Sequence, residues 1–126
     1  MDTKKILIVD DDEAIRSVLQ ELMVLLGHDA KTAADGFEAL YKIRQEFFDL
    51  VITDMHMPGM NGLELITLVK KEHPNIDLIA ITGYDTDYRY TDVIEVGASD
   101  FITKPFENNE LEAKINRVFR ERQLKK

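Results

Sequence analysis

Short apolar runs alternate along the chain with segments in which apolar residues recur at helical spacing. Ile6–Val9 is a run of four apolar residues, and apolar positions then recur three and four residues apart from Ile15 to Leu26. Gly27 is expected to end this helix. The alternation continues to the end of the chain, with strands expected at 6–9, 29–33, 50–52, 78–81 and 101–103. Strict alternation of strands and helices predicts an α/β fold, in which helical crossovers join parallel strands.

The polarity of each expected strand predicts its place in the sheet. Segments 6–9, 50–52 and 78–81 are apolar throughout, as strands buried on both faces are, whereas 29–33 and 101–103 carry polar residues, as edge strands do. This pattern predicts a flavodoxin-like, doubly wound, five-stranded parallel sheet of order 2-1-3-4-5 with five helices.

Apolar residues at helical spacing mark the expected helices. In the first two helices these include Val18, Phe37 and Phe47. His28 lies between the first helix and the second strand, and is expected in solvent at the helix end.

Composition narrows the class of protein. The chain has 126 residues, no cysteine and a net charge of −8. The absence of cysteine excludes disulfides and thiolate metal sites, and the negative charge argues against direct nucleic-acid binding. The apolar runs are far shorter than the roughly 20 residues that span a bilayer, so no membrane association is expected and a cytoplasmic location is predicted. Residues 1–126 are expected to form one domain, with 121–126 as the start of a linker or tail.

Polar residues of complementary chemistry follow the expected strands. Asp10 and Asp11 follow the first strand, Asp54 the third, Thr82 the fourth and Lys104 the fifth. Because parallel strands end at one edge of the sheet, these side chains are expected to meet there. Three close carboxylates favour a bound cation, and an oxygen site with open positions suits Mg²⁺. A carboxylate can attack phosphorus, while an ammonium and a hydroxyl stabilise the transferred oxygens.

Each residue also has a purely structural interpretation. Asp12 is expected to cap the first helix, since aspartate is a favoured N-cap. Thr82 could satisfy backbone groups at a strand end, and Lys104 could be a surface lysine. Phe101 is read from the sequence as packing at the edge of the core.

Four segments of the chain resemble the signatures of response-regulator receiver domains of two-component signal transduction, the CheY-like family. They are ILIVDD at 6–11, TDMHMPGMNG at 53–62, ITG at 81–83 and KPF at 104–106. The resemblance covers nearly the whole chain and implies one receiver domain.

The resemblance implies a role for each acidic residue. Asp54 is the phosphoacceptor, taking a phosphoryl group from a sensor histidine kinase or a phosphotransfer protein. Mg²⁺ is bound directly by Asp11 and Asp54, through water by Asp10, and by the main-chain carbonyl of His56. The domain is then a switch rather than an enzyme, and catalyses only its own phosphorylation and dephosphorylation.

The resemblance also implies how the signal leaves the site. Thr82 contacts the phosphoryl group, Lys104 pairs with it, and Phe101 is the aromatic switch residue that turns inward behind Thr82. The Lys104–Pro105 bond is expected to be cis. The fourth helix, last strand and last helix are expected to change and to control a downstream target protein or effector domain, and a phosphorylation-dependent homodimer through the fourth and last helices is a further prediction.

Two bulky residues near the site are candidates for setting the dephosphorylation rate. His56 lies two positions after the phosphoacceptor, and Tyr84 two positions after Thr82. The family resemblance implies that both positions influence the dephosphorylation rate. Our hypothesis is that a bulky ring at each slows the attack of water on the phosphoryl group; the alternative is that His56 is exposed and inert.

Two other functions stay open at this point. One is a Mg²⁺-dependent phosphatase with an aspartyl-phosphate intermediate, although His56 stands where such an enzyme would need a second acid. The other is a phosphorylation-independent adaptor or flavin-binding domain of the same fold. Flavin-phosphate loops are rich in Ser, Thr and Gly, whereas aspartates here would repel a phosphate.

Overall fold

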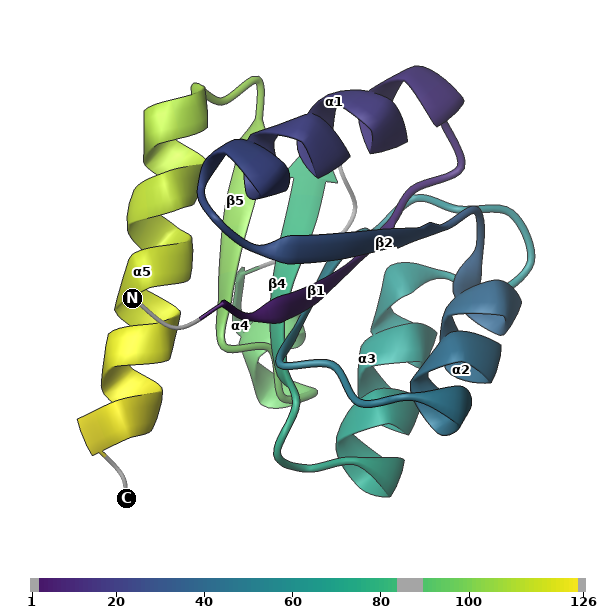
Figure 1. Cartoon of the computed structure of the whole chain (residues 1–126). Coiled ribbons are helices and arrows are strands. Elements are labelled where there is room, and N and C mark those ends of the chain that lie inside the picture. The colour runs from purple at the N-terminus through teal and green to yellow at the C-terminus, as the bar shows by residue number, and fades with distance from the viewer. Residues whose placement is uncertain (1–2, 84–89, 125–126) are drawn as a thin grey trace.

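The five strands form one parallel sheet of order β2-β1-β3-β4-β5, which confirms the predicted topology. The computed structural model describes residues 3–83 and 90–124. Its strands are β1 (Lys5–Val9), β2 (Asp29–Ala33), β3 (Leu50–Asp54), β4 (Asp77–Gly83) and β5 (Asp100–Lys104). Its helices are α1 (Glu13–Leu25), α2 (Gly36–Gln45), α3 (Gly62–Glu72), α4 (Tyr90–Glu95) and α5 (Asn108–Leu124). The five helices lie on the two sides of the sheet (Figure 1).

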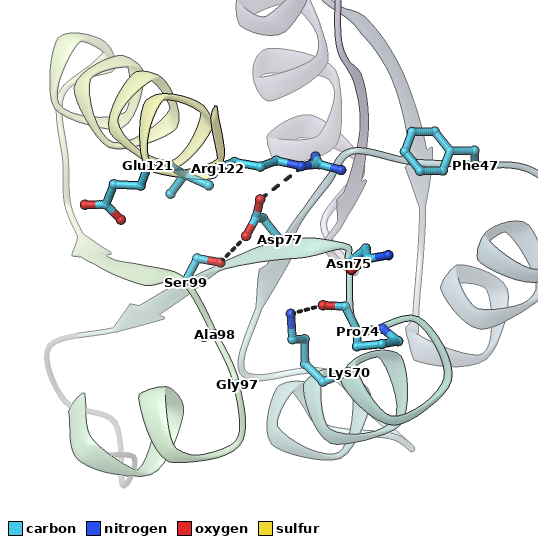
Figure 2. A pocket seen from close by; sticks show the side chains of 11 residues that line it. Phe47, Lys70, Pro74, Asn75, Asp77, Gly97, Ala98, Ser99, Glu121 and Arg122 are labelled. Carbon is cyan, nitrogen blue, oxygen red and sulfur yellow. Dashed lines mark hydrogen bonds and ion pairs between the residues drawn. The ribbon is translucent and has the colours of Figure 1, made fainter. Parts of the chain in front are cut away.

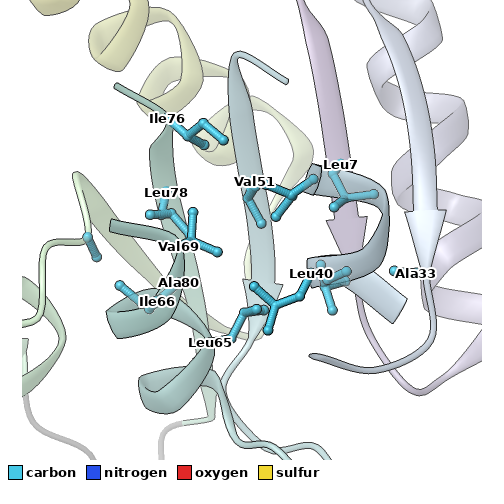
Figure 3. Packing of buried hydrophobic residues seen from close by; sticks show 14 of the residues in the cluster. Leu7, Ala33, Leu40, Val51, Leu65, Ile66, Val69, Ile76, Leu78 and Ala80 are labelled. Carbon is cyan, nitrogen blue, oxygen red and sulfur yellow. The ribbon is translucent and has the colours of Figure 1, made fainter. Parts of the chain in front are cut away.

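Alternate residues of the central strands point into two separate cores. Leu7 and Val51 pack with residues of α2, α3 and α4 on one face, and Figure 3 shows members of this cluster, among them Leu40 of α2. Ile8 and Ile52 pack with residues of α1 and α5 on the other. Burial on both faces explains why these strands are apolar throughout, and it fixes the register that brings the strand ends to one edge.

Polar caps begin the helices near this edge. Asp12 accepts hydrogen bonds from the backbone of Ala14 and Ile15, which confirms its predicted role as the N-cap of α1. Asn61 and Glu64 form a reciprocal capping box at the start of α3. These caps satisfy amides at the first helical turn, and so define where the loops after β1 and β3 end.

Val18, Phe37 and Phe47 belong to the helical pattern of apolar residues, but all three are more than half exposed. In α2 the buried face is made by Gly36, Ala39, Leu40 and Ile43. Small residues there allow a close approach: a Cβ added to Gly36 would lie 2.8 Å from the Met60 sulfur. Phe47 lies beyond the end of α2, where the helical period no longer applies.

His28 is not simply solvated, as was expected, but half-buried. Its Nδ1 accepts a hydrogen bond from the backbone amide of Lys4, and its ring stands edge-on to Phe119 of α5. Burial, and then the nearby Lys4 ammonium, lower the pKa of His28 below its ordinary value.

No helix in the described part of the chain has the length and apolar character needed to cross a membrane. Residues 121–124 belong to α5, and a linker or tail from 121–126 stays a prediction, as does the extent of the domain.

Candidate functional site

The strand register brings the ends of β1, β3, β4 and β5 to one edge. Val9 pairs with Thr53, Asp54 with Ile81, and Gly83 with Lys104. Asp10 follows β1 directly and its amide bonds to the Ala33 carbonyl of β2. The residues predicted to form the site therefore lie at the ends of neighbouring strands or just after them, although they are far apart in sequence.

Three carboxylates converge at this edge. Asp10, Asp11 and Asp54 each offer one oxygen, and these oxygens lie within 4.8 Å of one another. Asp10 and Asp54 are 1% and 6% exposed, whereas Asp11 is exposed. The cluster is thus closed on the side of the sheet and open to solvent past Asp11, as suits a cation that keeps some of its waters.

The Asp10 carboxylate has a buried oxygen that needs a partner. Oδ1 accepts a hydrogen bond from the Asp12 amide at 2.9 Å, but Oδ2 is enclosed and has no hydrogen-bond partner among the residues that the structure describes. Burial raises the pKa of Asp10 to about 6; the Asp12 amide opposes the rise and the Asp54 charge adds to it. An enclosed carboxylate oxygen without a hydrogen-bond donor is costly, and the Lys104 ammonium is only at the 4.0 Å limit of an ion pair with it, so these residues fit a divalent metal.

Asp54 lies between a positive charge and a backbone donor. Its Oδ2 is 3.5 Å from the Lys104 ammonium, which also lies 4.0 Å from Asp10 Oδ2. Its Oδ1 accepts a hydrogen bond from the His56 amide at 3.3 Å. This arrangement keeps a carboxylate at the sheet edge with an ammonium beside it, where a reacting group could approach from solvent.

The Thr82 hydroxyl is directed toward β5 in this structure. The side chain is buried, and its Oγ1 lies 3.5 Å from both the Ile102 carbonyl and the Thr103 hydroxyl. These contacts are those of a strand-end hydroxyl that satisfies local groups. Thr82 nevertheless lies on β4 next to Gly83, whose register partner is Lys104.

Phe101 packs at the edge of the core, as the sequence predicts. It is half-buried on β5 against the cluster that contains Val93 and Ala98. The Lys114 ammonium lies 5.6 Å from the centre of its ring. Lys114 also pairs with Asp100, so the environment of Phe101 is linked to the contact between β5 and α5.

The remaining site predictions have mixed outcomes. The Lys104–Pro105 bond is cis, as expected. The His56 side chain is exposed, and its influence on dephosphorylation stays a prediction. Tyr84 lies outside the described residues.

A family model described as the response regulator receiver domain matches residues 6–116. The chain belongs to this receiver domain family. It is 34% identical over 121 residues to the alkaline phosphatase synthesis transcriptional regulatory protein PhoP of Bacillus subtilis, covering 96% of this chain and 50% of that protein. It is 40% identical over 118 residues to the probable transcriptional regulator ycf27 of Cyanophora paradoxa, covering 93% and 48%.

Solved structures show the same relationship. The CheY-like receiver domain protein from Methanospirillum hungatei superposes with a TM-score of 0.93 at 34% identity, covering 99% of this chain and 100% of that one. The receiver domain spans about half the length of the curated relatives that it matches. Proteins of this family are signalling proteins of two-component systems.

The role of Arg16 at the receiver domain site was missed in the sequence, and Gly62 was noted there only as part of a motif. Arg16 donates from Nη1 to the main-chain carbonyl of Asp10 at 2.7 Å. Gly62 begins α3 where any side chain would collide: its Cβ would lie 2.7 Å from Met55 Cα and 2.9 Å from the Asp54 carbonyl oxygen. The contact from Arg16 back to Asp10, six residues earlier, follows no regular helical spacing and so gives no signal in the sequence. Gly62 is part of the family motif, and its glycine could have indicated a close approach of α3 to the backbone at the end of β3.

The receiver domain also has a pocket of about 710 Å³ at the opposite edge of the sheet. Its polar groups pair with one another: Ser99 donates to Asp77 at 2.8 Å, and Arg122 of α5 lies 3.9 Å from the other Asp77 oxygen (Figure 2). Arg122 also donates to the Asp49 carbonyl. The pairs anchor α5 to the starts of β3 and β4, and we interpret this pocket as structural.

Proposed function

We propose that this receiver domain is a phosphorylation-activated switch in which Asp54 accepts a phosphoryl group in a Mg²⁺-dependent reaction. The observation that carries the proposal is the position of the Asp54 carboxylate, at a solvent-facing sheet edge between the Lys104 ammonium and the acidic residues Asp10 and Asp11. A single nucleophile, one ammonium and a cation site are the parts that phosphoryl transfer requires.

We assign the metal to Asp10, Asp11, Asp54 and the His56 main-chain carbonyl. The enclosed Oδ2 of Asp10 and the proximity of the three carboxylates support this assignment. Bound Mg²⁺ would supply positive charge to the oxygens of the transferred group. Its presence would also lower the repulsion among the three carboxylates.

Residues of the chain supply the nucleophile and the groups that stabilise the transferred oxygens. An Asp54 carboxylate oxygen forms a bond to phosphorus while the bond from phosphorus to the donor breaks, and the donor leaves with that electron pair. Lys104 pairs with the transferred oxygens, and the Thr82 hydroxyl turns from β5 to donate to them. The donor is a sensor histidine kinase or a phosphotransfer protein.

The output is a change at the α4–β5–α5 face. Phosphorylation adds about −1.5 to −2 charges at the edge where β4 and β5 end. Movement of Thr82 away from the Ile102 and Thr103 oxygens leaves space behind it, into which Phe101 turns. The face then controls a downstream target protein or an effector domain, without direct nucleic-acid binding by this domain. A phosphorylation-dependent homodimer and a cytoplasmic location stay predictions.

The test is phosphorylation of the whole chain by acetyl phosphate or phosphoramidate in Mg²⁺, followed by intact mass. We expect one added phosphoryl group, absent in Asp54→Asn and in EDTA. Asp12→Asn is the matched control, since it removes a neighbouring carboxylate but keeps a good N-cap, and it should be labelled like the wild type. Labelling that persists in Asp54→Asn would overturn the assignment. Multiple turnover of small phosphoesters would favour a phosphatase, and failure to bind Mg²⁺ an adaptor.

A further inference from the structure

Arg16 holds the peptide group that joins two of the acidic residues. It is half-buried on the first turns of α1, and its Nη1 donates to the main-chain carbonyl of Asp10 at 2.7 Å. That carbonyl belongs to the peptide bond between Asp10 and Asp11. A guanidinium donating to a carbonyl makes a short, charge-assisted hydrogen bond, so the orientation of this peptide plane is restrained by Arg16.

The other polar groups of Asp10 are restrained as well. Its amide bonds to the Ala33 carbonyl at 3.1 Å, and its Oδ1 accepts from the Asp12 amide at 2.9 Å. The backbone of Arg16 is restrained too, because its amide donates to the Asp12 carbonyl at 3.0 Å. This bond holds the point from which the Arg16 side chain reaches back to Asp10. Asp10 Oδ2 has no hydrogen-bond partner among the described residues, and it lies 4.0 Å from the Lys104 ammonium.

Asp11 depends on these restraints more than the other two acids do. Asp10 and Asp54 are buried and held by hydrogen bonds, whereas the Asp11 side chain is exposed. The backbone position from which the Asp11 carboxylate extends is set by the orientation of the peptide that precedes it. Residues that orient metal ligands without touching the metal alter metal affinity about 10- to 100-fold when they are removed.

We infer that Arg16 is a positioning residue for the metal site, which preorganises Asp11 by holding the Asp10 carbonyl. This inference rests on the proposed Mg²⁺ site. It predicts that removal of Arg16 weakens Mg²⁺ binding, although Arg16 carries a positive charge close to the cation site. Removing that charge alone would tighten Mg²⁺ binding through reduced repulsion, whereas loss of the positioning hydrogen bond would weaken it.

The experiment is calorimetric titration of Mg²⁺ into the wild type, Arg16→Gln and Arg44→Gln at pH 7.5. Arg44→Gln is the matched control: it makes the same change of charge at an exposed arginine of α2 that pairs with Glu72. We expect Arg16→Gln to bind Mg²⁺ about tenfold more weakly, and Arg44→Gln to bind within about twofold of the wild type, since its exposed charge is screened. Unchanged or tighter binding by Arg16→Gln would overturn the inference.

A second readout follows the loop without metal. In Arg16→Gln the amide hydrogen of Asp12, bonded to Asp10 Oδ1, should exchange faster than in the wild type, while amides in the centre of β1 stay protected. Equal Asp12 protection would count against a positioning role. If Arg16→Gln does not fold, Arg16→Lys takes its place: it keeps the charge but not the guanidinium reach, so its Mg²⁺ affinity should fall several-fold, and an unchanged affinity would overturn the inference. Absent Mg²⁺ binding in the wild type would instead contradict the proposed function.

Discussion

The Lys104 ammonium lies 3.5 Å from Asp54 Oδ2 and 4.0 Å from Asp10 Oδ2. One positive charge therefore serves two carboxylates that end different strands. Its side chain is about one-third exposed, whereas both partners are nearly buried. Lys104 can thus follow a group that binds at Asp54 without uncovering the core.

Replacing Lys104 by glutamine should slow phosphorylation of Asp54 by roughly 10- to 100-fold, because one preorganised charge on the transferred oxygens is lost. The measurement is the rate of mass gain with acetyl phosphate in saturating Mg²⁺. Lys31→Gln is the control. Lys31 lies on the edge strand β2, away from the site, and its ammonium pairs with Glu46. A rate for Lys104→Gln within twofold of the wild type would remove Lys104 from the mechanism.

Asp10→Asn should stabilise the metal-free protein at pH 7. The folded-state pKa of Asp10 is about 6, above its ordinary value of 3.8. Between pH 4 and pH 6 the folded protein therefore binds more protons than the unfolded chain, and its free energy of unfolding falls as the pH rises from about 4 to 6. At about 1.4 kcal/mol per pKa unit the cost reaches about 3 kcal/mol above that window, and asparagine avoids it while it can keep the Asp12 hydrogen bond.

Urea unfolding in EDTA at several pH values measures this effect. The gain of Asp10→Asn over the wild type should be largest above pH 6 and should vanish near pH 4. The stability of Asp10→Asn is compared with that of the wild type because the lowered pKa of His28 changes stability in the opposite direction in both proteins. His28 makes the folded protein less stable as the pH falls below 6.5. A constant difference between the two proteins at all pH values would show that Asp10 does not titrate in this range.

Mg²⁺ binding should weaken in acid. Because a carboxylate must be ionised to hold the metal, binding below the Asp10 pKa of about 6 releases a proton. The apparent affinity should fall up to about tenfold per pH unit below pH 6 and change little between pH 7 and 8. Calorimetry in buffers of different ionisation enthalpy reports the released proton directly, and Asp10→Asn should release none. Proton release that is unchanged in this variant would assign the titration to another group.

Loss of two cations around Asp100 should be more costly than the sum of the single losses. Asp100 is 4% exposed and pairs with both Lys114 and Arg117 of α5. With either partner present the buried charge is still compensated, so Lys114→Gln or Arg117→Gln alone should cost about 1 kcal/mol or less. Together they leave a buried carboxylate that keeps the Phe101 amide as a hydrogen-bond donor but has lost both compensating charges, which costs about 3 to 5 kcal/mol. A double-mutant cycle from urea unfolding measures the coupling, and strict additivity would contradict the shared role.

The sequence alone was sufficient for the topology and for the residues gathered at the sheet edge. Apolar strands, helical spacing and capping residues are local signals, and a parallel sheet then places all strand ends on one side. Asp10, Asp11, Asp54 and Lys104 were predicted to meet, and the structure brings them together.

Only the tertiary structure decided which atoms of these residues are paired and which helix faces are buried. The exposure of Phe37 depends on how closely Gly36 lets α2 approach Met60. The enclosed Asp10 oxygen, which has no hydrogen-bond partner among the described residues, and the contact from Arg16 depend on the path of a loop and on the orientation of α1. Such contacts join residues without a fixed sequence spacing, and their free energies come from burial and hydrogen bonding, which exist only once the layers have packed.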